Sequence, residues 1–229
     1  MPELDESAVI HAPPSHCRVK ICGVTQRNQA LAIAALGADF MGLNFWPQSK
    51  RHLSPEAAAN WSHDVPRATK LVGVFVNPEA AFVIQTAAEV GLSYVQLHGD
   101  ESPDFCAELA GQGLKIIKAI QVKDESSLDH IASFHVTDML LDAYHPGQRG
   151  GIGQTFPWGL AQDFKLRYPD RKLWLAGGLT PENVADAVQG VQPFAVDVAG
   201  GVEDGIPGVK SLEKVQRFIE AARVIAPIR

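Results

Sequence analysis

Cysteine and clustered positive charge are both scarce in this 229-residue chain. Its three cysteines, Cys17, Cys22 and Cys106, form an odd set without a CxxC pair, so we expect no disulfide framework and a reduced, cytoplasmic setting. No run of Lys or Arg is longer than Lys50-Arg51, and 26 acidic against 20 basic residues give a formal net charge of −6. This balance argues against nucleic acid or an anionic membrane as a partner.

Long hydrophobic runs are missing as well. The longest candidate begins at Ala30 and is interrupted by Asp39, short of the ~18 to 20 apolar residues that span a bilayer. The first residues are acidic where a signal peptide would be basic and then apolar. We therefore expect no membrane association, a loose tail over residues 1–17 and one catalytic domain over residues 18–229.

Short apolar or β-branched runs alternate along the chain with stretches of helical spacing. The expected strands are Arg18–Cys22, Phe40–Phe45, Leu71–Val76, Tyr94–Leu97, Lys115–Ala119, Met139–Ala143, Leu173–Ala176 and Ala195–Val198. The expected helices are Gln26–Leu36, one capped by Ser54, Pro78–Val90, Pro103–Leu109, Asp124–Ser133, Trp158–Tyr168, one capped by Thr180, and Ser211–Ile225. This alternation predicts an α/β fold, a single-domain (β/α)8 TIM barrel. An open doubly wound sheet is the rival, but the residues after the first strand do not form its glycine-rich phosphate loop.

In such a barrel the active site lies where the strands end, at their C-terminal side. Glycine pairs follow two expected strands there, Gly177-Gly178 and Gly200-Gly201, and Gly151 and Gly153 lie in a third loop. Glycine lets the backbone approach an anion closely, so these loops are typical of a phosphate site. The alternative is that the glycines only make tight turns.

Five reactive or charged side chains lie at or after the ends of the expected strands: Cys22, Arg51, His98, Asp142 and Asp197. An acid at the end of a buried strand carries a desolvation cost, which favours a catalytic or binding role for Asp142 and, with less force, Asp197. A thiolate at Cys22 would serve as a base or nucleophile, although a free cysteine is more often inert packing. Arg51 has the planar guanidinium that binds carboxylates, yet loop arginines are usually solvated. His98 could belong to the site or be a hydrogen-bonded loop residue, and its position alone favours neither. No metal site is expected, because His and Cys near the N-terminus are irregularly spaced.

The motifs around these positions resemble the phosphoribosylanthranilate isomerase family of tryptophan biosynthesis, from about Arg18 to Ile225. They are Val19–Thr25, Gly42–Arg51, Gly73–Asn77, Val95–Gly99, Leu140–Asp142, Gly150–Phe156, Ala176–Leu179 and Val196–Val198. The resemblance implies an Amadori rearrangement of N-(5-phosphoribosyl)anthranilate to 1-(2-carboxyphenylamino)-1-deoxyribulose 5-phosphate. It also implies that no cofactor is needed and that the enzyme is a monomer or homodimer in the cytoplasm.

The resemblance assigns roles to the same residues. Asp142 would be the general acid and Cys22 the general base, while Arg51 would hold the anthranilate carboxylate. His98 would line the site, Asp197 would contact the sugar, and the glycine loops would carry the phosphate.

The chain departs from the family pattern in two places. Ala199 precedes the last glycine pair where the family usually has serine, and Pro157 replaces an Asp at the start of a helix. Three alternatives stay open: indole-3-glycerol phosphate synthase, the Amadori isomerase of histidine biosynthesis, and a non-catalytic barrel that binds a phosphorylated ligand. The synthase would need a catalytic lysine on an inner strand, and the histidine-pathway isomerase an Asp in place of Cys22.

Overall fold

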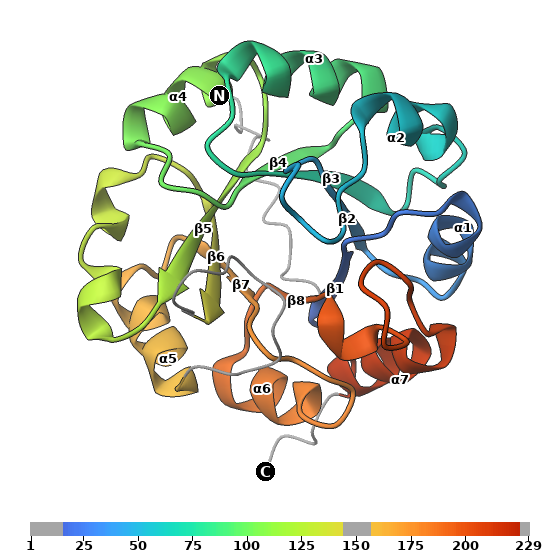
Figure 1. Ribbon diagram of the computed structural model, residues 1–229. Helices are drawn as coiled ribbons and strands as arrows, with labels where there is room; N and C mark the ends of the chain where they lie inside the picture. The colour runs from blue at the N-terminus through green and yellow to red at the C-terminus, as the bar shows by residue number, and fades with distance from the viewer. Residues whose placement is uncertain (1–15, 144–156, 225–229) are drawn as a thin grey trace, which may run out of the picture.

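A computed structural model describes residues 16–143 and 157–224, and its strands close into a parallel barrel in chain order, ringed by helices (Figure 1). The strands are β1 (Arg18–Cys22), β2 (Phe40–Asn44), β3 (Lys70–Phe75), β4 (Tyr94–Leu97), β5 (Ile116–Val122), β6 (Asp138–Ala143), β7 (Lys172–Leu175) and β8 (Ala195–Val198). The α-helices are α1 (Arg27–Ala35), α2 (Pro55–Ser62), α3 (Ala80–Val90), α4 (Pro103–Gly111), α5 (Trp158–Arg167), α6 (Val184–Val191) and α7 (Leu212–Ala222). The predicted (β/α)8 fold is confirmed, and the predicted tail lies outside the described residues up to position 15.

The predicted helix over Asp124–Ser133 is wrong. Two 3-10 segments, η1 (Glu125–Leu128) and η2 (Ile131–Ser133), stand between β5 and β6. The Ser127 hydroxyl accepts hydrogen bonds from the backbone N–H groups of Lys123, at 3.1 Å, and Asp124, at 3.3 Å. Side-chain oxygens of this kind offer the backbone an alternative to the α-helical ladder.

The predicted cap at Thr180 is also wrong, because α6 begins at Val184 and its N-cap is Asn183. The Thr180 hydroxyl instead accepts from Glu182 N–H at 3.2 Å, within the turn that precedes the helix. By contrast, Ser54 caps α2 as predicted and accepts from Ala57 N–H at 3.2 Å. At the other end of the chain, α7 stops at Ala222, so its expected extension to Ile225 is wrong for the described residues.

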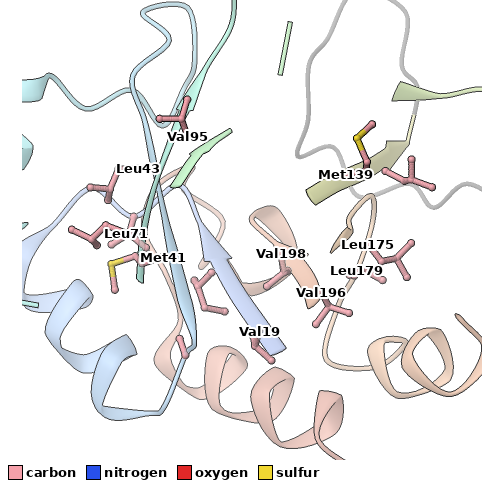
Figure 2. Packing of buried hydrophobic residues seen from close by; sticks show 14 of the residues in the cluster. Val19, Met41, Leu43, Leu71, Val95, Met139, Leu175, Leu179, Val196 and Val198 are labelled. Carbon is pink, nitrogen blue, oxygen red and sulfur yellow. The ribbon is translucent and has the colours of Figure 1, made fainter. Parts of the chain in front are cut away.

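Strand residues alternate between two apolar clusters. The larger one lies between the barrel and its helices, and Figure 2 shows Val19, Met41 and Val196 among its side chains. A smaller cluster contains Leu140 and Trp174. Since Leu140 shares a strand face with Asp142, this cluster fills the inside of the barrel below the strand ends. Within the described parts of the chain, no helix is both long and apolar enough to cross a membrane.

Candidate active site

Nine of the predicted site residues line one cleft at the C-terminal end of the barrel. They are Cys22, Arg51, His98, Asp142, Gly177, Gly178, Asp197, Gly200 and Gly201. The other two, Gly151 and Gly153, lie outside the described residues. The closed barrel brings these positions together because every strand ends on the same side.

Cys22 ends β1 above a buried ion pair. Lys20 points to the same side of the strand, is fully buried, and donates from Nζ to Asp197 Oδ1 at 2.9 Å. The pairing follows from register, since Lys20 lies opposite Asp197 on β8. Gly42 lies opposite Cys22 on β2, where an added Cβ would be 2.7 Å from Cys22 Sγ and 3.1 Å from Lys20 Nζ. The glycine therefore makes room for the thiol and the ammonium side by side.

The electrostatics of Cys22 reflect two opposing effects. Burial raises the pKa of the thiol above its usual value, and the negative charge of Asp197 acts in the same direction. The positive charges of Lys20 and Lys210 oppose the increase. A thiolate at this position thus depends on its ammonium neighbours.

Asp142 is the penultimate residue of β6, which is three strands from β1 around the barrel. Its side chain is buried, and Oδ1 accepts from the N–H of Ala143 at 2.9 Å. Oδ2 lies 3.2 Å from His98 Nε2, and Nδ1 of the same ring lies 2.8 Å from Gln96 Nε2. The carboxyl and the thiol therefore approach the cleft from different strands, as an acid and a base acting on one small ligand require.

Arg51, in the loop after β2, binds a carboxylate of the protein itself. Its Nε and Nη2 donate to Glu203 Oε1 and Oε2, both at 2.7 Å. Glu203 Oε1 also accepts from Gly208 N–H at 2.8 Å and from Lys210 Nζ at 3.0 Å. One edge of the predicted carboxylate fork is thus already in use.

The two described glycine loops are shaped by steric limits. Gly177 and Gly178 have φ values of 84° and 63°, a region that L side chains rarely adopt. An added Cβ at Gly177 would be 2.7 Å from the backbone nitrogen of Ala143. One at Gly201 would collide with the carbonyl oxygen of Leu179, so the loops after β7 and β8 are in direct contact at the cleft.

Sequence reasoning missed several residues of this region, of which Trp46, Glu203 and Lys210 matter most here. Trp46 lines the cleft, and its aromatic ring could meet an apolar part of a ligand. Glu203 and Lys210 lie beyond the last glycine pair, and both are buried although charged. The only signal in the sequence was an acidic residue, Glu203, shortly after the Gly200-Gly201 turn, and this position does not indicate which side chain the acid would bind. Among residues 16–143 and 157–224 no group of three or more His, Cys, Asp or Glu side chains could hold a metal ion.

Comparison with known proteins gives a consistent result. Residues 19–221 match the family described as N-(5'phosphoribosyl)anthranilate (PRA) isomerase. A protein of Geobacter sulfurreducens named N-(5'-phosphoribosyl)anthranilate isomerase is 48% identical over 206 residues, covering 90% of this chain and 98% of the relative. The crystal structure of phosphoribosyl anthranilate isomerase from Thermotoga maritima has a TM-score of 0.82 at 41% identity, covering 90% and 98% of the two chains. Another, in complex with reduced 1-(o-carboxyphenylamino)-1-deoxyribulose 5-phosphate, has a TM-score of 0.77 at 39% identity, with the same coverage.

Proposed function

The chain belongs to the N-(5'-phosphoribosyl)anthranilate isomerase family, and we propose that Asp142 and Cys22 are the acid and the base of its reaction. The protein is an enzyme of tryptophan biosynthesis that converts N-(5-phosphoribosyl)anthranilate to 1-(2-carboxyphenylamino)-1-deoxyribulose 5-phosphate. Membership of this family decides against the two neighbouring barrel enzymes and against a non-catalytic binding protein.

The first step is ring opening. Asp142 donates its proton to the furanose ring oxygen, the C1–O bond breaks, and the lone pair of the anthranilate nitrogen forms a C1=N bond. The Cys22 thiolate then removes the proton from C2, and the released electrons form a C1=C2 bond while the C=N electrons return to nitrogen. The enol proton leaves oxygen and C1 gains a proton, which gives the ketone. Nothing is oxidised or reduced overall, so the reaction as written requires no cofactor.

The remaining residues bind the substrate. Arg51 holds the anthranilate carboxylate, and His98 contacts Asp142 from the wall of the cleft. Asp197 uses Oδ1 for Lys20, so a sugar hydroxyl would donate to Oδ2. The loops that contain Gly177, Gly178, Gly200 and Gly201, together with the loop that contains Gly151 and Gly153, hold the phosphate. Anchoring the phosphate away from the reacting carbons supplies binding energy that positions C1 and C2.

We further propose that the enzyme acts in the cytoplasm and is a monomer or homodimer. Sedimentation equilibrium of the purified chain tests the oligomeric state. The observation that best supports the assignment of roles is the convergence of Cys22, Asp142 and Arg51 on one cleft with two glycine-pair loops.

The decisive experiment is turnover. The purified chain should consume N-(5-phosphoribosyl)anthranilate, measured as a decrease in the fluorescence of the substrate. Its gene should restore growth without tryptophan to a host that lacks the isomerase. Absence of both activities would overturn the function. Activity that survives in both Cys22→Ala and Asp142→Asn would overturn the roles while leaving the function intact.

A further inference from the structure

Glu203 is the central member of a buried charge cluster that includes Arg51, a residue of the cleft lining. Its side chain is 7% exposed and lies between Arg51 and Lys210. Burial alone would raise the pKa of this carboxyl, but the hydrogen bond from Arg51 and the charge of Lys210 bring it below its usual value. Glu203 is therefore a fixed anion of the folded protein.

The geometry of the Arg51–Glu203 pair leaves part of the guanidinium available. Glu203 takes the edge formed by Nε and Nη2. The other edge of a guanidinium, formed by its two Nη atoms, can bind a second carboxylate through two parallel hydrogen bonds. A ligand carboxylate can thus be bound without displacing Glu203.

The aliphatic part of the Arg51 side chain is confined as well as its guanidinium. Gly23, which follows β1, has a φ of 75°, and a Cβ added there would collide with Arg51 Cδ. The side chain accordingly crosses the backbone next to Cys22 and ends on Glu203. Because its aliphatic part packs against Gly23 and its Nε–Nη2 edge binds Glu203, the guanidinium can direct its other edge in few orientations.

The same carboxylate links Arg51 to the loop after β8. Lys210 Nζ donates to Glu203 Oε1 at 3.0 Å and to the carbonyl oxygen of Ala199 at 3.0 Å. Ala199 directly precedes the glycine pair assigned to the phosphate. A continuous chain of hydrogen bonds therefore joins the loop assigned to the phosphate with Arg51, the side chain assigned to the anthranilate carboxylate.

We propose that Glu203 is a positioning residue that sets the carboxylate specificity of the cleft by holding one edge of Arg51 and directing the other toward the substrate. The inference rests on the proposed role of Arg51. It predicts that Glu203 affects binding of ligands that carry the aromatic carboxylate and has little effect on otherwise identical ligands that lack it.

The test compares two ligands. The first is reduced 1-(o-carboxyphenylamino)-1-deoxyribulose 5-phosphate, and the second is the same molecule with a phenyl group in place of the carboxyphenyl group. The wild-type enzyme should bind the first about 10-fold or more tightly, the order expected for charge-assisted hydrogen bonds to one carboxylate. Isothermal titration gives both dissociation constants without any need for turnover.

Two substitutions separate positioning from charge. Glu203→Asp keeps the negative charge but shortens the reach, and Glu203→Gln keeps the size but removes the charge. Both should reduce the preference for the carboxylate ligand to about 3-fold or less, chiefly through weaker binding of that ligand. If Glu203 merely masked the charge of Arg51, Glu203→Gln would instead raise the preference, and the proposal would be wrong.

Glu101→Gln is the matched control. Glu101 is also a buried carboxylate that does not line the cleft, with Oε2 2.7 Å from Lys118 Nζ and Oε1 accepting from Asn77 N–H at 2.8 Å, but these partners do not include Arg51. This variant should lose stability and keep the carboxylate preference. Equal weakening of both ligands by the Glu203 variants, or an unchanged preference, would overturn the inference.

Failure of the underlying assignment looks different. A wild-type enzyme that turns over its substrate but shows no carboxylate preference would remove Arg51 from carboxylate binding, and Glu203 with it. A chain without turnover would contradict the function itself. If Glu203→Gln fails to fold, as circular dichroism would reveal, Glu203→Asp alone decides the question.

Discussion

His98 Nε2 lies 3.2 Å from Oδ2 of Asp142, so a side chain that follows β4 lies next to the carboxyl near the end of β6. The imidazole is itself fixed, because its Nδ1 lies 2.8 Å from the Gln96 amide nitrogen. Gln96 and His98 are two residues apart and therefore point to the same side of the strand. From this arrangement we expect His98 to orient the proposed acid in addition to lining the cleft.

Asp142→Asn tests the acid. Asparagine keeps the shape of the side chain but cannot deliver a carboxylic proton, so kcat should fall by ~10² or more, as for loss of a general acid. Binding of the reduced product analogue should change little. Steady-state kinetics and isothermal titration measure the two effects separately. An asparagine variant with wild-type kcat would remove Asp142 from the mechanism.

His98→Gln tests positioning of the acid. If His98 acts through Asp142, its replacement should lower kcat by about 10-fold, less than Asp142→Asn does, and leave KM close to wild type. Combining the two substitutions should cost little more than Asp142→Asn alone, since both affect the same proton transfer. Additive losses would mean that His98 has an independent role.

Cys22→Ala tests the base. Loss of the group that accepts the C2 proton should reduce kcat by ~10² or more, with the dissociation constant of the reduced analogue within a few fold of wild type. Cys106→Ala is the matched control, because Cys106 is buried on α4 and does not line the cleft. If both variants behaved alike, Cys22 would be a packing residue.

Lys20→Met tests how the thiolate is maintained. The thiolate is the anionic form, so removing a neighbouring positive charge raises the pKa of Cys22, and the rise of alkylation rate with pH should move to higher pH. At a fixed pH of about 8, close to the ordinary thiol range, iodoacetamide should therefore modify Cys22 more slowly in this variant. Mass spectrometry of tryptic peptides resolves the site, because cleavage after Arg18 separates Cys17 from Cys22.

The other two cysteines serve as internal references for this measurement. Burial raises the pKa of Cys17 to about 12 and that of Cys106 to about 11, so both should react slowly in every variant. Lys20→Met also leaves Asp197 without its ion pair, which acts on Cys22 in the same direction. An unchanged or faster alkylation of Cys22 would show that Lys20 does not support the thiolate.

The strands could be predicted from the sequence because apolar runs with clear boundaries encode them. Tyr94–Leu97 and Ala195–Val198 agree to the residue with the structure. The segment after β5 could not be predicted, since its helical spacing competes with hydrogen bonds that the Ser127 hydroxyl accepts from nearby backbone N–H groups. A pattern of apolar positions does not indicate which of the two local arrangements is favoured.

The position of the site was predictable for a similar reason, since a barrel gathers its strand ends. The partners of the site residues were not. Arg51 and Glu203 are 152 positions apart, and Lys20 and Asp197 are 177 apart. These pairs depend on the closure of β8 onto β1 and on the course of a loop, neither of which a local pattern specifies.

Gly201→Val tests the phosphate site. A side chain at this position would collide with the Leu179 carbonyl and push the loops after β7 and β8 apart. Gly178→Val places a β-branched residue at a φ of 63°, which strains the turn itself. Both substitutions should weaken inhibition by inorganic phosphate and binding of the reduced analogue by about 10-fold or more, if those loops supply charge-assisted hydrogen bonds to the anion.

Gly190→Ala is the control for the glycine variants. Gly190 lies in α6, and a Cβ added there meets no atom within 4 Å. Alanine in a helix should stabilise the protein by about 0.5–1 kcal/mol and leave phosphate binding unchanged.

Anthranilate, which has no phosphate, should bind the variants at positions 178 and 201 as it binds wild type, provided that circular dichroism shows an intact fold. Weakening of anthranilate and phosphate together would mean that the loops shape the whole cleft, and unchanged phosphate inhibition would place the anion elsewhere. Only selective loss of the phosphate contribution fits an anion held by the backbone of these two loops, because they contribute glycines and no cationic side chain to the cleft.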